Sequence, residues 1–292
     1  METRQANTAS VTPKPERSQI MTRDGLALPL YRWRAAGLRR ATVALVHGLA
    51  EHAGRYAALA HMLNAHGIEL LAVDLRGHGN APGRRAWVER FDEYLLDADA
   101  LVGEAARNDG PLFLMGHSMG GAIAALHTIE QKADGRRALS GLILSSPALA
   151  PGRDVPRWML ALSQKISRVW PSFPAMKIDA ALLSRDQSVV DANRNDPLVH
   201  HGAIPARTGA ELLLAMQRIE QGRARLRTPL LVWHGTADKL TEPEGSRDFG
   251  AHAGSPDKTL TIYDGSYHET MNDLDRERVI DALVAWILKR SE

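Results

Sequence analysis

Short apolar runs alternate with helical patterns along most of the 292-residue chain. The runs are rich in valine, isoleucine and leucine, and most lack the polar–apolar alternation of a half-exposed strand, which is typical of strands that helices cover on both faces. They lie at residues 41–48, 68–77, 111–118, 141–149, 230–238 and 258–265, with helical patterns at 54–67, 91–106, 119–131 and 274–289. We therefore expect an α/β fold with a mostly parallel central sheet flanked by helices.

The alternation stops in residues 151–228, a segment that contains six prolines. Two amphipathic patterns within it predict helices, at residues 157–170 and 208–222. A turn signal at Arg23–Gly25 predicts an early hairpin of two strands, so the run at 141–149 is the sixth expected strand. We expect residues 151–228 to form a helical cap inserted after that strand, between the core segments 19–150 and 229–292.

Composition narrows the classes of function. The chain is 44% hydrophobic and 24% charged, which is typical of a globular protein. Its 36 basic and 34 acidic residues leave a formal charge of +2, which is too small to indicate a nucleic-acid partner. Cysteine is absent, which excludes disulfides, thiolate nucleophiles and cysteine–zinc sites. The sequence has no H-E-x-x-H or P-loop motif, so we expect neither a metal nor a cofactor.

The N-terminal segment has no sign of a secretory signal. Residues 1–18 contain charges and prolines but no apolar core of the length that such a signal needs. We expect residues 1–18 to be disordered and the protein to be cytoplasmic.

The sharpest chemical signal is a G-x-S-x-G motif at Gly116–Gly120, between a strand-like run and a helical pattern. A serine on a tight turn from strand to helix crowds its neighbours, so glycines two positions before and after it leave room for the backbone. The turn exposes the hydroxyl above the sheet and directs the first free amides of the helix to the same place. We interpret Ser118 as a nucleophile, in preference to an incidental serine in a glycine-containing turn.

A serine hydroxyl needs a general base, and the base needs an orienting acid. In the order serine, acid, histidine, the run at 230–238 ends with Asp238, and His268 follows the next strand-like run. Both follow strands of the expected parallel sheet at its carboxyl edge, where such sheets collect their sites. Taken alone, Asp238 reads as a capping carboxylate and His268 as a surface histidine. Four rivals of the same residue types match placement and order less well: Asp264, Asp273, His234 and His252.

The oxyanion formed by attack on a carbonyl needs donors that are fixed in advance. The Met119 amide follows the nucleophile directly. A second amide is expected from the loop at 47–50, after the first buried strand, and Leu49 is our choice. Both residues would donate through the backbone. The alternative for this loop is a plain turn at the end of a strand.

Four segments together resemble the monoacylglycerol lipase and lysophospholipase family of α/β-hydrolases. They are H-G-L-A-E-H-A-G-R-Y at 47–56, D-L-R-G-H-G at 74–79, G-H-S-M-G-G at 116–121 and H-G-T-A-D at 234–238. The resemblance covers nearly the whole chain after residue 18. It implies the α/β-hydrolase fold and the same triad and oxyanion residues as the motifs above. It also implies that Glu51, His52 and Arg55 organise the oxyanion loop.

The resemblance implies a serine esterase that cleaves a lipid monoester, most directly a monoacylglycerol to fatty acid and glycerol. The reaction would proceed through an acyl-enzyme, with His268 as general base and then general acid. One alternative is a lysophospholipase or short-chain carboxylesterase with the same machinery. Another is a ligand-binding protein on this fold without catalysis, which the complete set of candidate residues disfavours.

The first expected cap helix carries an apolar stripe, made of Trp158, Leu162, Ile166, Val169 and Trp170. Nearby basic residues outnumber acidic ones: Arg153, Arg157, Lys165, Arg168 and Lys177 against Asp154 and Asp179. An apolar stripe with a basic flank suits the surface of a membrane or micelle, so we expect peripheral contact there through the cap. The equally supported alternative is that the stripe packs over the sheet and closes the acyl tunnel.

Overall fold

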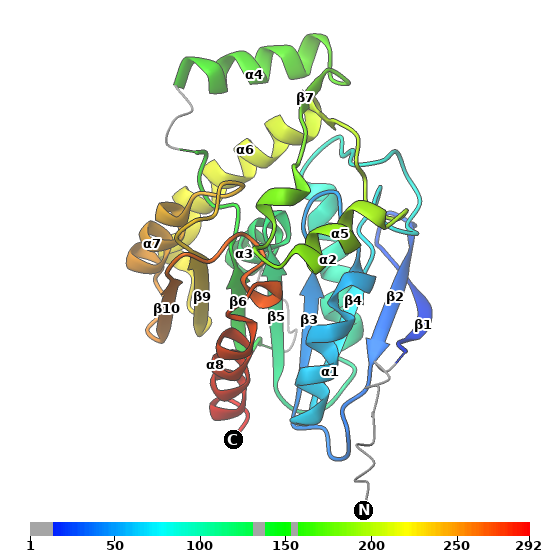
Figure 1. The fold of residues 1–292 in the computed structure, drawn as a ribbon, viewed down its shortest axis with the longest axis vertical. Helices are drawn as coiled ribbons and strands as arrows, with labels where there is room; N and C mark the ends of the chain where they lie inside the picture. Colours follow the sequence, from blue (N-terminus) through cyan, green and yellow to red (C-terminus); the bar gives the residue numbers. More distant parts are fainter. Residues whose placement is uncertain (1–13, 131–137, 153–156) are drawn as a thin grey trace, which may run out of the picture.

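An eight-stranded sheet lies at the centre of the protein in the computed structural model (Figure 1). The structure describes residues 14–130, 138–152 and 157–292, with the backbone alone for 157–161. The strand order is β1-β2-β4-β3-β5-β6-β9-β10; β2 is antiparallel to both of its neighbours, and the other pairs are parallel. The strands are β1 (Glu16–Met21), β2 (Ala27–Trp33), β3 (Ala41–Val46), β4 (Ile68–Val73), β5 (Leu112–His117), β6 (Gly141–Ser145), β9 (Leu230–Gly235) and β10 (Lys258–Tyr263).

Helices cover both faces of the sheet, which explains why the central strands are apolar at every position. On β3, Val43 and Leu45 pack with helices on one face, whereas Ala44 and Val46 pack with helices on the other. The first face carries α1 (Ala57–Ala65) and α8 (Arg276–Lys289); the second carries α2 (Asp92–Ala105), α3 (Met119–Glu130) and α7 (Pro243–His252). Short 3₁₀ turns η1 (Ala53–Tyr56) and η4 (Thr270–Asn272) precede α1 and α8. The expected α/β-hydrolase architecture is confirmed.

The segment after β6 lies over the carboxyl ends of the strands (Figure 1). It begins after the sixth strand of the sheet, as the sequence predicts, and its two expected helices are present. The segment also contains several shorter elements. In chain order, its helices, strands and turns are α4 (Arg157–Val169), β7 (Pro174–Met176), η2 (Ala180–Leu182), α5 (Gln187–Asn195), β8 (Ile204–Pro205), α6 (Ala206–Gly222) and η3 (Arg223–Arg225).

Five elements differ from the sequence expectations. α5, α7 and the two-stranded ladder of β7 with β8 have no counterpart in the predicted pattern. The N-terminal strand β1 begins at Glu16. Residues 16–18, the end of the segment 1–18 that we expected to be disordered, therefore belong to a strand. Glu16 pairs with Arg32 across the ladder, and its carboxylate accepts a 2.8 Å hydrogen bond from Arg34. Residues 1–13 lie outside the described part of the chain.

Candidate active site

Ser118 lies on a strained turn, as the single residue between β5 and α3. Its φ of +54° is in the left-handed region that residues other than glycine rarely adopt. A Cβ on Gly116 would lie 2.1 Å from the carbonyl oxygen of Gly120, and a Cβ on Gly120 would lie 2.2 Å from the carbonyl oxygen of Val46. Both positions require glycine, which is the physical reason for the G-x-S-x-G pattern.

The structure brings Asp238 and His268 together. Asp238 follows β9 and His268 follows β10, and these two strands are neighbours in the sheet. His268 Nδ1 lies 2.7 Å from Asp238 Oδ2, and both side chains are buried. The amides of Leu240 and Thr241 donate to Asp238 Oδ1 over 2.8 and 3.1 Å. Because the carboxylate engages Nδ1, Nε2 is the imidazole nitrogen that remains for a proton from serine.

Ser118 and His268 line the same large cavity. The ring of His117, next to Ser118 in the chain, packs against His268 with centroids 4.7 Å apart. The structure has no hydrogen bond between the Ser118 hydroxyl and His268. Such bonds are often formed only with substrate in place, so the arrangement remains suited to proton transfer.

The charges of the pair shift both of its pKa values. Burial by itself would raise the pKa of Asp238, but the charge of His268 and hydrogen bonds from His234 and His268 outweigh it and hold that pKa well below its usual range. Burial by itself would lower the pKa of His268, but the Asp238 carboxylate outweighs it, and the pKa is raised above 6.5. The pKa of His117 is shifted in the opposite direction. Burial is the larger cause and the charge of His268 the smaller, and together they lower this pKa to about 4. The site therefore holds an ionised acid beside an unusually basic imidazole.

A second imidazole contacts the same carboxylate. His234 Nε2 lies 3.0 Å from Asp238 Oδ2, and its Nδ1 lies 2.7 Å from the Ser246 hydroxyl. The Thr241 hydroxyl lies 2.8 Å from the same carboxylate oxygen. His234 is fully buried and does not line the large cavity, so it reaches the acid but not a substrate. From the sequence alone, His234 is a rival of His268. Its position four residues before Asp238 is the signal that could have indicated its contact with that carboxylate.

Leu49 and Met119, which the sequence predicts as oxyanion donors, both line the cavity that holds Ser118. Within the described part of the chain, neither backbone amide has a hydrogen-bond partner, so both N–H groups are free to donate to a ligand. The loop lies close to the serine, since a Cβ on Gly48 would lie 3.2 Å from Ser118 Cβ. Two fixed amides beside a serine can stabilise a developing oxyanion.

A buried ion network connects the loop of Leu49 with the loop of His268. Arg55 Nη1 lies 2.7 Å from Glu51 Oε2 and 2.7 Å from Glu269 Oε1. The other oxygen of Glu51 accepts from the Gly48 amide over 2.6 Å and from the Tyr56 hydroxyl over 2.8 Å. The Glu269 side of this network was not found from the sequence, although Glu269 directly follows His268.

The remaining rivals lie in other networks. Asp264 accepts from the Thr236 hydroxyl over 3.0 Å. Asp273 bonds Arg185, and His252 bonds the Asp248 main chain. None of these three rivals lines the large cavity. Asp238 is therefore the acid that meets a cavity-lining histidine.

The cavity has a volume of about 970 Å³ and two kinds of wall. One wall is apolar and comes from α4 and α6, with Leu162, Ile166, Leu213 and Met216 among its residues. The other contains the polar side chains of Glu51, Arg55 and Glu269. Such a cavity can hold a ligand that has both an apolar chain and a polar group.

Comparison with known proteins identifies the family. A family model described as serine aminopeptidase, S33 matches residues 37–275. A monoacylglycerol lipase of Mycolicibacterium smegmatis is 37% identical over 252 residues, which are 85% of this chain and 88% of the relative. The chain belongs to the monoacylglycerol lipase family of α/β-hydrolases. The family resemblance of its four sequence segments is thereby confirmed, and this α/β-hydrolase is a serine ester hydrolase.

Further relatives cover this α/β-hydrolase almost completely. The monoglyceride lipase of Homo sapiens is 32% identical over 284 residues, 96% of this chain and 92% of the relative. The crystal structure of Paleococcus ferrophilus monoacylglycerol lipase superposes with a TM-score of 0.78 and 34% identity, over 89% of this chain and 99% of that one. A monoglyceride lipase variant from Saccharomyces cerevisiae, with a TM-score of 0.81 over 96% of both chains, is 22% identical and shows the fold alone. In the part of the hydrolase that the structure describes, every helix is too short or too polar to cross a membrane.

Proposed function

We propose that the protein hydrolyses monoacylglycerols to fatty acid and glycerol. The observation that carries this proposal is that Ser118 and His268 line one cavity together with apolar residues of α4 and α6 and with the polar side chains of Glu51, Arg55 and Glu269. The apolar wall suits an acyl chain and the polar wall suits a glycerol. The activities named for the relatives from Mycolicibacterium smegmatis and Homo sapiens support the same substrate.

The mechanism that we propose uses an acyl-enzyme. Ser118 Oγ attacks the ester carbonyl while His268 Nε2 accepts the hydroxyl proton, and Asp238 stabilises the imidazolium. The amides of Leu49 and Met119 donate to the oxyanion of the tetrahedral intermediate. The C–O bond to glycerol breaks, and His268 returns the proton to the leaving oxygen. Water then attacks the acyl-enzyme with the same base, which releases the fatty acid and restores Ser118.

We propose that residues 151–228 act as a cap, with 19–150 and 229–292 as the core. Leu162 and Ile166 of the expected stripe line the cavity, which supports a role in closing the acyl tunnel. Val169 and Trp170, in contrast, are 88% and 58% exposed, which supports contact with a lipid surface. Lys165 and Arg168 beside them are exposed as well. We therefore propose that the stripe has both of the roles considered. The side chains of Trp158 and Arg157, and residues Arg153 and Asp154, lie outside the described part.

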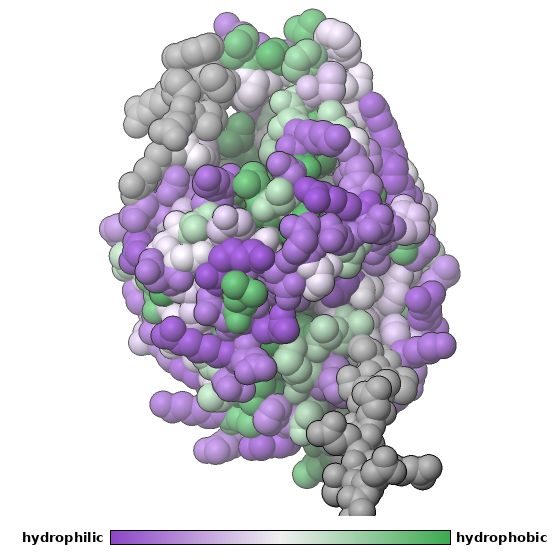
Figure 2. Space-filling model, in the orientation of Figure 1, coloured by the Kyte–Doolittle hydropathy of each residue, from purple (hydrophilic) through white to green (hydrophobic). Residues whose placement is uncertain are grey.

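Apolar side chains are visible on the upper edge of the molecule, over the cap (Figure 2). A Val169→Ser/Trp170→Ser variant should bind phospholipid vesicles more weakly and turn over micellar substrate more slowly, yet hydrolyse a soluble short-chain ester normally. Met21→Ser/Leu38→Ser is the matched control, because these two exposed apolar residues lie outside the cap. Equal losses on soluble and micellar substrates, or no vesicle binding by the parent protein, would contradict lipid contact.

The function is tested by combining turnover with active-site labelling. Purified protein should release fatty acid and glycerol from a monoacylglycerol, and Ser118→Ala should abolish release while the fold is retained. A fluorophosphonate probe should attach to Ser118, as mapped by mass spectrometry, and monoacylglycerol should slow the labelling. Attachment at another residue, or turnover that survives in Ser118→Ala, would refute the proposed nucleophile.

A further inference from the structure

Thr241 contacts two separate parts of the site. It lies three residues after Asp238, in the loop between β9 and α7, and it lines the large cavity. Its amide donates to Asp238 Oδ1 over 3.1 Å, and its hydroxyl donates to the carbonyl oxygen of Ser146 over 3.0 Å. Thr241 therefore holds the proposed acid through its main chain and the turn after β6 through its side chain.

The turn at Ser146 is strained. Ser146 follows β6 and has a φ of +40°, in the left-handed region, which persists in a residue other than glycine only where the surrounding contacts enforce it. Its amide donates to the carbonyl oxygen of Trp233 on β9 over 2.9 Å. Among the described residues, the Thr241 hydroxyl is the one group that donates to the Ser146 carbonyl. The conformation of this turn thus depends in part on Thr241.

The same turn holds the main chain of the nucleophile. The Ser118 amide donates to the carbonyl oxygen of Ser145 over 3.0 Å, and the Ala148 amide donates to the carbonyl oxygen of Ser118 over 2.9 Å. Both polar groups of the Ser118 main chain are therefore bonded to residues that flank the strained position. A continuous series of contacts runs from the Thr241 hydroxyl, through residues 145–148, to Ser118.

The Thr241 hydroxyl also lies against the acid and the base. Its oxygen is 2.8 Å from Asp238 Oδ2, 3.2 Å from His268 Nδ1 and 3.2 Å from His234 Nε2. Because the carboxylate is ionised, the two imidazole nitrogens that face it carry hydrogen, and the lone pairs of the hydroxyl oxygen can accept from both. A single hydroxyl thus contacts the turn that holds the nucleophile and the pair that activates it.

We propose that Thr241 is a positioning residue that sets the place of His268 relative to Ser118. The inference rests on the proposed roles of Ser118, Asp238 and His268 in ester hydrolysis. No hydrogen bond joins the described side chains of Ser118 and His268, so their relative position has to come from other contacts, and the Thr241 hydroxyl supplies one. A small displacement of the base slows proton transfer from the serine, whereas it leaves the binding of substrate unchanged.

The test removes the hydroxyl and then restores it. Thr241→Val keeps the branched shape of the side chain and the amide bond to Asp238 but has no hydroxyl. We expect its kcat for octanoylglycerol, used below the concentration at which it aggregates, to fall about tenfold, with KM changed by less than about twofold. Thr241→Ser should recover kcat to within about threefold. Labelling of Ser118 by a fluorophosphonate should slow about tenfold in the valine variant as well, because labelling needs the same serine and base but no glycerol.

Thr236→Val is the matched control. Thr236 also follows β9, and its hydroxyl donates to Asp264 over 3.0 Å, but it is exposed and does not line the large cavity. This variant loses the same chemical group from the same loop. It should keep kcat, KM and the labelling rate within about twofold of the parent protein.

Three outcomes would overturn the positioning role. Full kcat in a folded Thr241→Val protein would show that the hydroxyl is not needed, and an equal loss in Thr241→Ser would show that the hydroxyl is not the cause. A higher KM with unchanged kcat would assign Thr241 to substrate binding instead. If circular dichroism shows that the valine variant is unfolded, Thr241→Ala is judged by the same criteria. A parent protein that neither hydrolyses octanoylglycerol nor is labelled at Ser118 would refute the proposed function itself, and the positioning role with it.

Discussion

The substitution Asp238→Asn removes the charge of the acid but keeps a side chain that can hydrogen-bond His268. The asparagine side chain is close in shape to aspartate but carries no charge, and its amide N–H can donate to His268 Nδ1. That bond favours the tautomer with hydrogen on Nε2, the nitrogen that must accept the Ser118 proton. Of the titratable groups that act on His268, namely Asp238, His117, Glu269 and Glu51, Asp238 is the one that accepts a hydrogen bond from it, and the Thr241 hydroxyl lies 3.2 Å from the same nitrogen. We expect kcat/KM to fall about 10⁴-fold at its optimum pH.

The pH dependence of kcat/KM is the second property that Asp238→Asn should change. In the parent protein, kcat/KM should fall as pH drops through the raised pKa of His268, that is, at a pH above 6.5, because protonated imidazole cannot accept a proton. The Asp238 carboxylate is what raises this pKa against the effect of burial, so removal of its charge should move the acid limb of the residual activity to lower pH.

The assay is initial-rate hydrolysis of a soluble ester between mildly acidic and mildly basic pH, with circular dichroism to verify the fold. Asp264→Asn is the matched control, since this exposed carboxylate bonds Thr236 and lies away from the cavity. It should change kcat/KM by less than about twofold, as expected for a surface substitution. A folded Asp238→Asn protein with nearly full activity, or a larger loss in Asp264→Asn, would refute the assignment of the acid.

Two further predictions concern the supports of the site. Gly120→Ala should destabilise the fold by more than about 3 kcal/mol, because the new Cβ would lie 2.2 Å from a main-chain oxygen of β3. Gly103→Ala is the control: its Cβ would meet open space, so it should stabilise the fold by up to about 1 kcal/mol. Similar denaturation midpoints for the two variants would contradict this prediction. His234→Leu should lower kcat by about tenfold through the lost hydrogen bond to the acid, and His234→Gln should restore most of it. Equal kcat values in the leucine and glutamine variants would show that the hydrogen bond is irrelevant.

The core of the fold was predictable because burial leaves a local signature. β3, β4, β5 and β9 are buried at every position, and this produces the continuous apolar runs. α5 has no such signature; it depends on the Asp186 side chain, which accepts from the Ser188 amide at its first turn, and on burial of Val190 and Asn193. Those contacts arise from packing over the core, so a single sequence does not display them.

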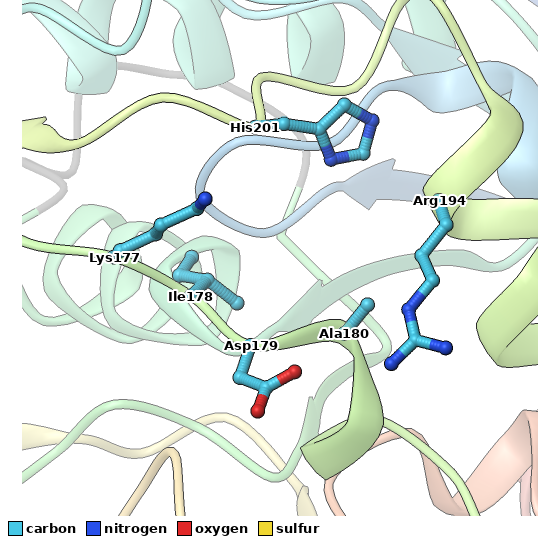
Figure 3. Close-up of a pocket in the computed structure, with 6 residues that line it drawn as sticks. All are labelled: Lys177, Ile178, Asp179, Ala180, Arg194 and His201. Carbon is cyan, nitrogen blue, oxygen red and sulfur yellow. The ribbon is translucent and has the colours of Figure 1, made fainter.

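The candidate site likewise contains residues with a local signal in the sequence and contacts that depend on how distant segments pack. The turn that carries Ser118 was predictable because glycine at 116 and 120 is a local steric requirement of that turn. Asp238 and His268 could be chosen because both follow strands at one edge of the sheet. The bond from Arg55 to Glu269 joins residues 214 positions apart, so it depends on how two loops meet. A second cavity, lined by residues 177–180, 194 and 201 (Figure 3), likewise combines segments whose proximity no spacing rule reveals.

The cap and the chemistry are coupled through main-chain contacts. The Glu269 amide donates to the carbonyl oxygen of Leu183, and the His200 amide donates to that of Ala50. One bond holds the loop of His268, the proposed base, and the other holds the residue after Leu49, the proposed oxyanion donor. A displacement of the cap segment 183–201 would therefore move both the imidazole and the amide that act on the ester. Since we propose that both groups act in the transition state, substitutions that break either main-chain bond should alter kcat as well as KM, even where the altered side chain does not touch substrate.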